Sequence, residues 1–124
     1  MTMAVNMREP VDPVMEAIAA AVRNYTNAHP SAEADIYRYS PVSVRVRVVD
    51  PDFRGKSRSE RHKIVWPLLY ALDADILADL TILLLLAPDE LESSIANRDF
   101  DTPVFAAEYA AALKAVSGGG AATP

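Results

Sequence analysis

The first part of the chain shows apolar residues at helical spacing. One stripe contains five apolar side chains: Val14, Ile18, Ala21, Val22 and Tyr25. Asp12 precedes the stripe and can cap free backbone amides, and Pro13 suits the first position of a helix because its missing N–H is not needed there. Pro30 disfavours helical backbone at the residue before it. The pattern therefore predicts a helix from residue 12 to residue 29.

A period of two replaces the helical period in the next segment. Val44, Val46 and Val48 alternate with one serine and two arginines, Ser43, Arg45 and Arg47. This alternation is typical of a strand with one buried face and one face in water, so we expect Arg45 and Arg47 on the exposed face. The aromatic and β-branched residues 36–39 predict a partner strand, and residues 40–41 interrupt the pair.

The segment after this strand predicts helical structure in two pieces. Asp50, Pro51 and Asp52 end the strand, and Ser57 with Glu60 fits a capping box. The apolar face that follows consists of Ile64, Val65, Leu68, Leu69 and Leu72. Pro67 removes a helical hydrogen bond and crowds the preceding turn. We therefore expect a short helical turn that carries Arg61 and His62, and then a helix that begins or kinks at residues 66–67.

The last third of the chain alternates between apolar segments and breaks. Residues 73–75 read as a break. Residues 80–86 are apolar on both parities apart from Thr81, and this length favours a strand buried on both faces, although periodicity alone does not exclude a helix. A short helix is expected over residues 88–96, followed by a polar connection at 97–101 in which Phe100 is an aromatic plug. A last helix begins at residues 102–103 and ends before the glycines at 118–120.

These elements predict an α+β fold with the order α-β-β-α-α-β and a C-terminal helical extension. The expected organisation is a flexible tail at 1–10, one domain at 11–90, the helical extension at 91–117 packed on that domain, and a disordered tail at 118–124. The extension carries Phe105, Tyr109 and Leu113 in line. This stripe either covers the sheet or faces a second copy of the chain, which would form a homodimer.

Composition limits the class of protein. The 124 residues include no cysteine, which excludes disulfides and thiolate metal ligands in this chain. The start lacks the apolar core of a secretory signal, and the longest apolar run, Ile82 to Ala87, is far shorter than the roughly 20 residues that span a bilayer. We therefore expect a cytoplasmic protein that does not enter the membrane. No nucleophile–base arrangement, phosphate-binding loop or dinucleotide fingerprint is evident, so no catalytic residue is named.

Charge is distributed unevenly along the chain. The net charge is −5, yet residues 54–63 contain five basic residues and one acidic residue, Glu60. Such a run is either a solvated start of a helix or a surface that faces a partner. Phosphates need only positive charge, so nucleic acid is one candidate partner. The chain has Gly55 alone in place of the Gly-x-x-Gly loop with which KH domains hold nucleic acid.

Several short motifs resemble the BolA family. They are the loop Asp52-Phe53-Arg54-Gly55-Lys56-Ser57, the pair Arg61-His62, the apolar positions Val65 and Leu68-Leu69, and the closing Leu86-Ala87-Pro88-Asp89-Glu90. BolA-like proteins carry a similar F-x-G-K-S loop, an R-H pair four residues on, a leucine-rich helix and a strand that ends in a T-P-E-like turn. The resemblance covers residues 11–90.

The resemblance implies a fold related to the type II KH domain, with a three-stranded mixed sheet and helices on one face. It implies a protein without enzymatic activity that binds a glutaredoxin-like partner and shares a [2Fe–2S] cluster with it, and no cofactor of its own. His62 corresponds to a histidine ligand of the family. This chain has Asp79 near the position of the second metal-associated histidine, and Ser40-Pro41 in the loop that supplies Cys or His in some members.

We expect residues 53–66 to form the functional surface of an adaptor that binds a protein partner. Its candidate binding residues are Phe53, Arg54, Gly55, Lys56, Arg58, Arg61, His62 and Lys63. One alternative is a transcriptional regulator that binds nucleic acid through the basic residues at 54–63. Another is a structural or dimerisation domain. His62 is the single candidate metal ligand, and His29 is expected to be a residue at a helix end.

Overall fold

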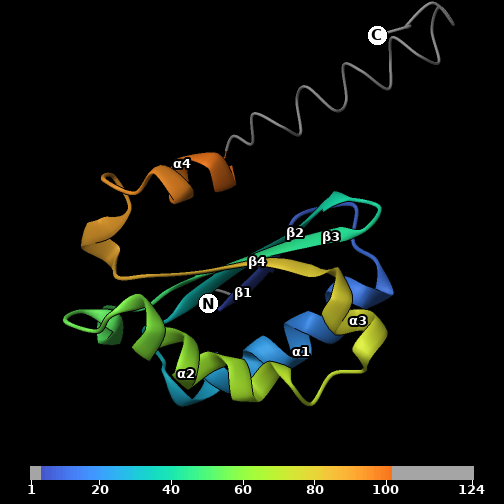
Figure 1. Cartoon of the computed structure of the whole chain (residues 1–124), viewed down its shortest axis with the longest axis horizontal. Coiled ribbons are helices and arrows are strands. Elements are labelled where there is room, and N and C mark those ends of the chain that lie inside the picture. Colours follow the sequence, from blue (N-terminus) through green and yellow to red (C-terminus); the bar gives the residue numbers. More distant parts are fainter. Residues whose placement is uncertain (1–3, 102–124) are drawn as a thin grey trace, which may run out of the picture.

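The computed structural model of the chain describes residues 4–101, which form an α+β fold with one mixed sheet (Figure 1). The sheet has four strands in the order β1-β2-β3-β4. β1 (Val5–Met7) runs parallel to β2 (Glu33–Ser40), β2 is antiparallel to β3 (Ser43–Val49), and β3 is parallel to β4 (Leu80–Leu86). The helix expected over residues 102–117 and the tail at 118–124 lie outside the described residues.

The strand β1 corrects two expectations from the sequence, a flexible tail at residues 1–10 and a sheet of three strands. Val5 lies opposite Ala34 and Met7 opposite Ile36, and only 3% of Val5 is exposed. Three residues are too few to show a period of two. β1 is fixed by its hydrogen bonds to β2 and by burial of Val5, and both of these depend on residues distant in the sequence.

The predicted first helix is present as α1 (Pro13–Ala28), with its cap at Asp12. The Asp12 carboxylate accepts a hydrogen bond from the backbone N–H of Met15 at 2.9 Å. Ile18, Val22 and other residues of the apolar stripe are buried against the sheet. The helix has 16 residues, and both of its ends fall within one residue of the prediction. The local signals in the sequence and the packing of the helix therefore agree.

The helix α2 (Arg58–Leu69) is continuous, which corrects the expectation of two pieces. The capping box of Ser57 and Glu60 is confirmed, with bonds of 2.8 and 3.1 Å. Pro67 lies in the last turn, so it removes one helical hydrogen bond without interrupting the turns before it. Burial of Val65 and Leu69 in the core stabilises the helix on both sides of this proline.

The break expected at residues 73–75 is instead the start of α3 (Ala74–Asp79), with Asp73 at its N-cap. Asp75 and Asp79 therefore lie on one helix, at the spacing that places two carboxylates on one face. Asp79 forms an ion pair with Arg38 at 3.0 Å, so its carboxylate joins α3 to β2. The strand predicted at residues 80–86 is confirmed as β4, but Thr81 and Ile82 are exposed, so burial on both faces is limited to residues 84–86.

The chain after β4 differs from the prediction. A 3₁₀ turn, η2 (Pro88–Glu90), stands where the helix 88–96 was expected, and α4 (Ile95–Asp101) stands where the polar connection was expected. Phe100 is nevertheless buried, with 1% exposed, as predicted for an aromatic plug. α1, α2 and α3, the helices of the domain expected at 11–90, share one face of the sheet, and α4, which lies in the expected extension, is on the opposite face (Figure 1).

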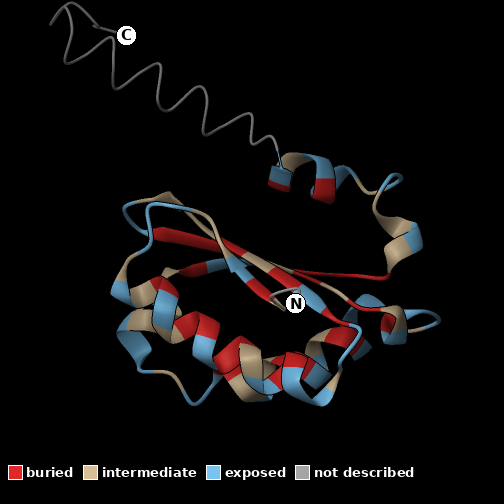
Figure 2. Cartoon of the chain, turned by 180° about the vertical axis from the view of Figure 1, so that it is seen from behind, coloured by how far each residue is buried: buried red, intermediate tan, exposed pale blue. Residues whose placement is uncertain are grey.

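The core has two parts, one on each face of the sheet. The main cluster lies between the sheet and α1 to α3 and contains Ile18, Val46, Val48 and Val65. Figure 2 shows the buried residues along the strands and on the sides of the helices that face them. The smaller cluster, on the other face, consists of Leu84, Leu86 and Phe100. Within residues 4–101, none of the helices combines the length and the hydropathy that crossing a membrane requires.

Candidate functional site

Arg61, one of the predicted binding residues, is a structural clamp. Its guanidinium donates hydrogen bonds to the Glu90 carboxylate at 2.5 and 2.8 Å, and to the backbone carbonyl groups of Leu85 and Lys56 at 3.0 Å each. Only 8% of its side chain is exposed. The hydrogen bonds from Arg61 lower the pKa of Glu90 to about 2. Arg61 therefore holds the loop before α2 against β4 and η2, and its charge is not available to a partner.

Phe53 and Gly55 shape this loop from within. Phe53 ends a short 3₁₀ turn, η1 (Pro51–Phe53), and its ring is fully buried against Tyr25 at 5.7 Å between ring centroids. Gly55 has a φ of +76°, in the left-handed region where a side chain is strained. Lys56 donates a hydrogen bond to the Asp52 carbonyl at 3.0 Å. Phe53 is thus a core residue, and the glycine is a conformational requirement of the turn.

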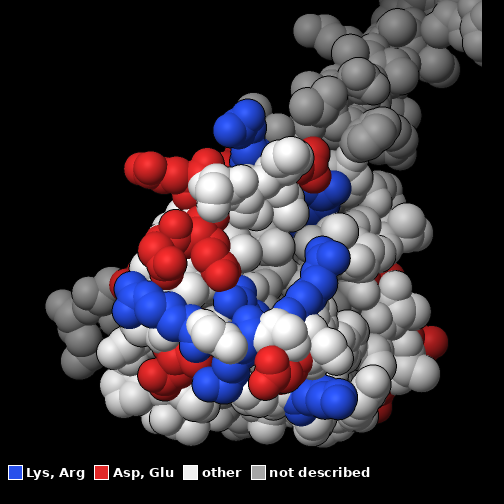
Figure 3. Space-filling view, turned by 60° about the vertical axis from the view of Figure 1, so that its left-hand side comes forward, with Lys and Arg blue, Asp and Glu red and all other residues white. Residues whose placement is uncertain are grey.

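The remaining basic side chains of the loop and α2 stand among acidic ones. Figure 3 views the side of the molecule that carries the loop before α2 and η2, and Asp and Glu side chains are interleaved there with Lys and Arg. Arg54 pairs with Asp89 at 3.1 Å, and Glu60 lies one turn into α2. Arg58 and Lys63 are exposed. The local excess of positive charge in the sequence is therefore reduced in space by η2.

The outer face of α2 carries an aromatic ladder that the binding prediction covered only in part. His62, Trp66 and Tyr70 follow one another at a spacing of four residues, with ring centroids 6.5 and 5.6 Å apart. Together with Ser59, Lys63 and Pro67 they line a groove of about 320 Å³. Tyr70 is 68% exposed. The signal that could have identified Trp66 and Tyr70 is their helical spacing from His62.

His62 has one ring nitrogen already engaged. Its Nδ1 accepts a hydrogen bond from the indole N–H of Trp66 at 2.9 Å, so the proton of the neutral imidazole is on Nε2. Burial, and to a smaller extent the charge of Arg58, lower the pKa of His62. His62 also lines a second cavity of about 320 Å³ between the start of α2, β4 and α4.

The residues around His62 do not fit a [2Fe–2S] cluster. Ligation through Nε2 would move the ring proton to Nδ1 and break the bond to Trp66. The chain contains no cysteine, and Asp79, near the place of the family's second histidine, is paired with Arg38. A partner would have to supply the other ligands of any shared cluster.

His29, predicted to be a residue at a helix end, does cap α1, and it also contacts two carboxylates, the buried Asp50 and the exposed Asp52. Its Nδ1 lies 3.1 Å from Asp52 and 3.6 Å from Asp50, and its ring stacks on Tyr25 at 4.1 Å. Asp50 is fully buried, and it accepts hydrogen bonds from the Tyr25 hydroxyl and from the Asp52 backbone N–H. Burial and these acidic neighbours raise the pKa of Tyr25. Hydrogen bonds thus account for the arrangement, and we assign it no metal.

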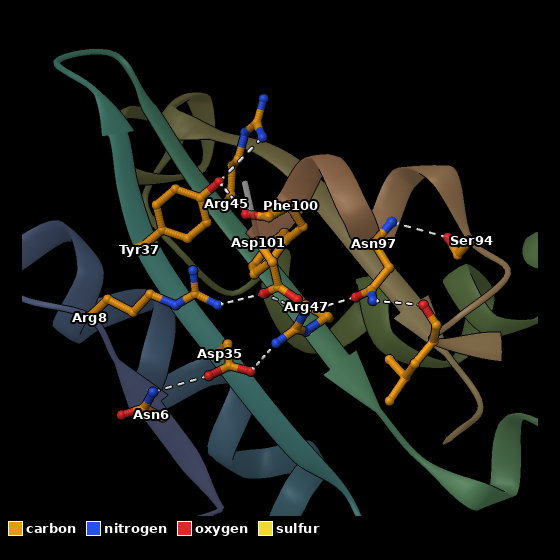
Figure 4. Close-up of polar contacts among 11 residues, drawn as sticks. Asn6, Arg8, Asp35, Tyr37, Arg45, Arg47, Ser94, Asn97, Phe100 and Asp101 are labelled. Carbon is orange, nitrogen blue, oxygen red and sulfur yellow. Dashed lines mark hydrogen bonds and ion pairs between the residues drawn. The ribbon is translucent and has the colours of Figure 1, made fainter. Parts of the chain in front are cut away.

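Arg45 and Arg47, predicted to face water, are covered by α4 (Figure 4). Arg45 pairs with Asp99 at 3.0 Å, and Arg47 pairs with Asp35 at 2.6 Å and with Asp101 at 2.8 Å. The alternation of β3 assigned these arginines to the correct side of the strand. It carried no information about the helix that covers this side, which comes from residues about 50 positions later.

Comparisons with known proteins do not place the chain in a family. No protein-family model matches it, and a search of curated proteins finds none with significant similarity.

Proposed function

We propose that this chain is a non-enzymatic, BolA-like adaptor that binds a protein partner through the outer face of α2. The observation that carries the proposal is the groove along the aromatic ladder of His62, Trp66 and Tyr70. Aromatic side chains are enriched at protein interfaces because they bury a large area and still offer a polar group. Tyr70, the C-cap residue of α2, is 68% exposed at the end of this groove.

The groove is attached to a rigid frame. At one end of α2, Arg61 joins the helix to Glu90 and to the Leu85 carbonyl, and the capping box fixes the first turn. Along the helix, Val65 and Leu69 are buried in the main core. A partner therefore meets a surface that is already ordered, and little conformational entropy is lost on binding.

The charges beside the groove indicate the chemistry of the partner. Lys63 lines the groove, and Arg58 is exposed one turn earlier on α2. A complementary surface would carry an apolar or aromatic ridge with carboxylates at its rim. A glutaredoxin-like protein is the partner that the resemblance suggests, and the proposal does not require a shared cluster.

The test is affinity purification from the native host, followed by titration of the purified partner. Two variants change exposed residues of the groove, Tyr70→Ser and Lys63→Glu. Val42→Ser is the matched control, because Val42 is 71% exposed in the turn between β2 and β3. We expect the wild type and Val42→Ser to bind the same partner equally, and both groove variants to bind it at least about tenfold more weakly.

A monothiol glutaredoxin is titrated in parallel against the same four proteins, with fluorescence of the single tryptophan, Trp66, as the signal. Equal binding of a partner by the wild type and both groove variants would refute the proposed surface. Recovery of nucleic acid instead of protein, lost in Lys63→Glu, would favour the nucleic-acid alternative.

A further inference from the structure

The sheet face beneath α4 is lined with arginine and tyrosine side chains. Arg45 and Arg47 come from β3 and Tyr37 from β2, while Arg8 follows β1 (Figure 4). The Arg8 guanidinium lies 5.0 Å from the centre of the Tyr37 ring. The Arg45 guanidinium donates to the Tyr37 hydroxyl at 3.3 Å. Tyr39, also on β2, lies 3.9 Å from the Arg45 guanidinium. This face therefore offers cations beside aromatic rings, separate from the α2 groove.

The residues of α4 that contact this face, Asp99-Phe100-Asp101, are complementary to it in charge and in aromatic character. Asp99 pairs with Arg45, and Asp101 pairs with both Arg47 and Arg8, at 2.8 and 2.9 Å. The Phe100 ring packs edge-on against Tyr37 at 5.0 Å and lies 4.8 Å from the Arg47 guanidinium. Two carboxylates with an aromatic ring between them are thus the chemistry that this face recognises.

α4 is attached to the sheet by one buried ring, Phe100, and by polar contacts of Asn97, Asp99 and Asp101. The smaller cluster, which α4 completes with Phe100, is separate from the main core, and none of the described residues after Ala87 is buried in the main cluster. The side chains of Asp99 and Asp101 are 40% and 46% exposed, so their ion pairs are partly screened by solvent. Segments of this kind open locally at a lower free energy than the global unfolding of a protein.

α4 also leaves the arginines incompletely satisfied. The Nε atoms of Arg45 and Arg47 are buried, and neither has a hydrogen-bond partner among the described residues. A guanidinium binds a carboxylate most strongly through two parallel N–H groups, and α4 uses one nitrogen of Arg45 for Asp99. A ligand with better-placed carboxylates can therefore compete with α4 for this face.

We propose that α4 is a displaceable internal ligand and that the face beneath it is a docking site for an acidic segment with a central aromatic residue, supplied by a protein partner. Charge complementarity favours this occupant, because α4 itself shows that carboxylates and a phenyl ring fit. Single-stranded nucleic acid, which also combines negative charge with rings that stack, is the competing occupant.

The experiment uses the full chain with three changes that remove the acidic and aromatic side chains of α4: Asp99→Asn, Phe100→Ala and Asp101→Asn. We call this protein the erased variant. A fluorescent peptide that copies residues 93–101 is titrated by anisotropy, and a scrambled peptide and a short oligothymidylate are titrated in parallel. Ile95→Ser is the matched control on α4, because Ile95 is 79% exposed. Addition of Arg47→Gln to the erased variant tests the docking site itself.

We expect the erased variant to bind the peptide, and the wild type and Ile95→Ser to bind it at least about tenfold more weakly, because α4 occupies their site. Arg47→Gln should remove the binding, and added salt should weaken it. Three results with a folded erased variant would overturn the proposal. They are no binding of the peptide, equal binding of the scrambled peptide, and binding of the oligothymidylate alone. If the triple variant does not fold, Phe100→Ala alone replaces it. Failure of both to fold would show that α4 is an integral part of the core, which also overturns the proposal.

Discussion

Arg61 and Glu90 form a two-pronged ion pair, with hydrogen bonds of 2.5 and 2.8 Å, across 29 positions of the sequence. The pair joins the Arg-His motif at the start of α2 to the Pro-Asp-Glu turn after β4. Arg54 and Asp89 make a second connection between the same segments at 3.1 Å. The loop, the Arg-His pair and the closing turn that resemble the BolA family are therefore joined by one set of contacts, and these contacts place the aromatic ladder of α2 relative to the sheet.

Removal of the Glu90 carboxylate should destabilise the fold. Glu90→Ala leaves the Arg61 charge buried without its acidic partner, and we expect a loss of about 2 kcal/mol in the free energy of unfolding. Urea denaturation followed by circular dichroism measures this loss. Asp89→Ala is the control, because Asp89 is 67% exposed and its pair with Arg54 should contribute less than about 1 kcal/mol. Equal losses of free energy of unfolding in Glu90→Ala and Asp89→Ala would contradict the role of the Arg61–Glu90 pair as a clamp.

The Arg61–Glu90 pair should make the free energy of unfolding depend on pH in the acidic range between about 2 and 4.5. The pKa of Glu90 is about 2 in the folded protein, against an ordinary value of 4.5. A group with a depressed pKa stabilises the fold fully above its unfolded value and loses this effect as the pH falls through the folded value. The difference in free energy of unfolding between wild type and Glu90→Gln should therefore be largest above pH 4.5 and shrink towards pH 2. A difference that stays constant with pH would exclude this linkage.

Protonation of His62 should be visible in the fluorescence of Trp66, the only tryptophan of the chain. Protonated His62 cannot accept the indole hydrogen bond, and the pKa of His62 is lowered from its ordinary value of 6.5. We expect a fluorescence transition below pH 6.5, absent in His62→Gln, with the folded state losing stability as the pH falls through it. Arg58→Gln should raise the transition only in part, because burial is the larger cause of the lowered pKa.

Gly55→Ala tests the turn before α2. A Cβ atom at this position would meet no atom within 4 Å, so the substitution creates no clash. The cost comes from the φ of +76°, and we expect a loss of about 1 kcal/mol in the free energy of unfolding. Gly55→Asn should lose less, because asparagine tolerates this conformation better than alanine does. Thermal unfolding measures the stability of the two variants. An equal loss in both would show that the positive φ of residue 55 is not the cause of the loss.

The sequence predicted those parts of the fold whose signals are local. α1, the capping box of Ser57 and Glu60, β3 and β4 each follow from a period or a cap within a few residues. β1 could not be predicted in this way, because it depends on pairing with β2. Pro67 does not divide α2, because a proline in the last turn of a packed helix disrupts less than one at its centre.

The sequence places the loop and the start of α2 correctly, but it does not show which atoms their side chains contact. Basic and aromatic residue types do not reveal that Arg61 is clamped or that Phe53 is buried, because their partners, Glu90 and Tyr25, are distant in the sequence. The expectation that Arg45 and Arg47 face water was wrong for the same reason, because their partners on α4 are distant in the sequence. A strand pattern states which residues share a side, and only the tertiary fold decides what covers that side.

The bond from Arg61 to the Leu85 carbonyl has a consequence for solubility. Among the described strands, β4 stands at the end of the sheet, and it consists almost entirely of leucine and isoleucine. An apolar strand with free backbone groups along its outer side is a template onto which another chain can add. By occupying the Leu85 carbonyl with a buried cation, Arg61 blocks the addition of another chain at this point of β4.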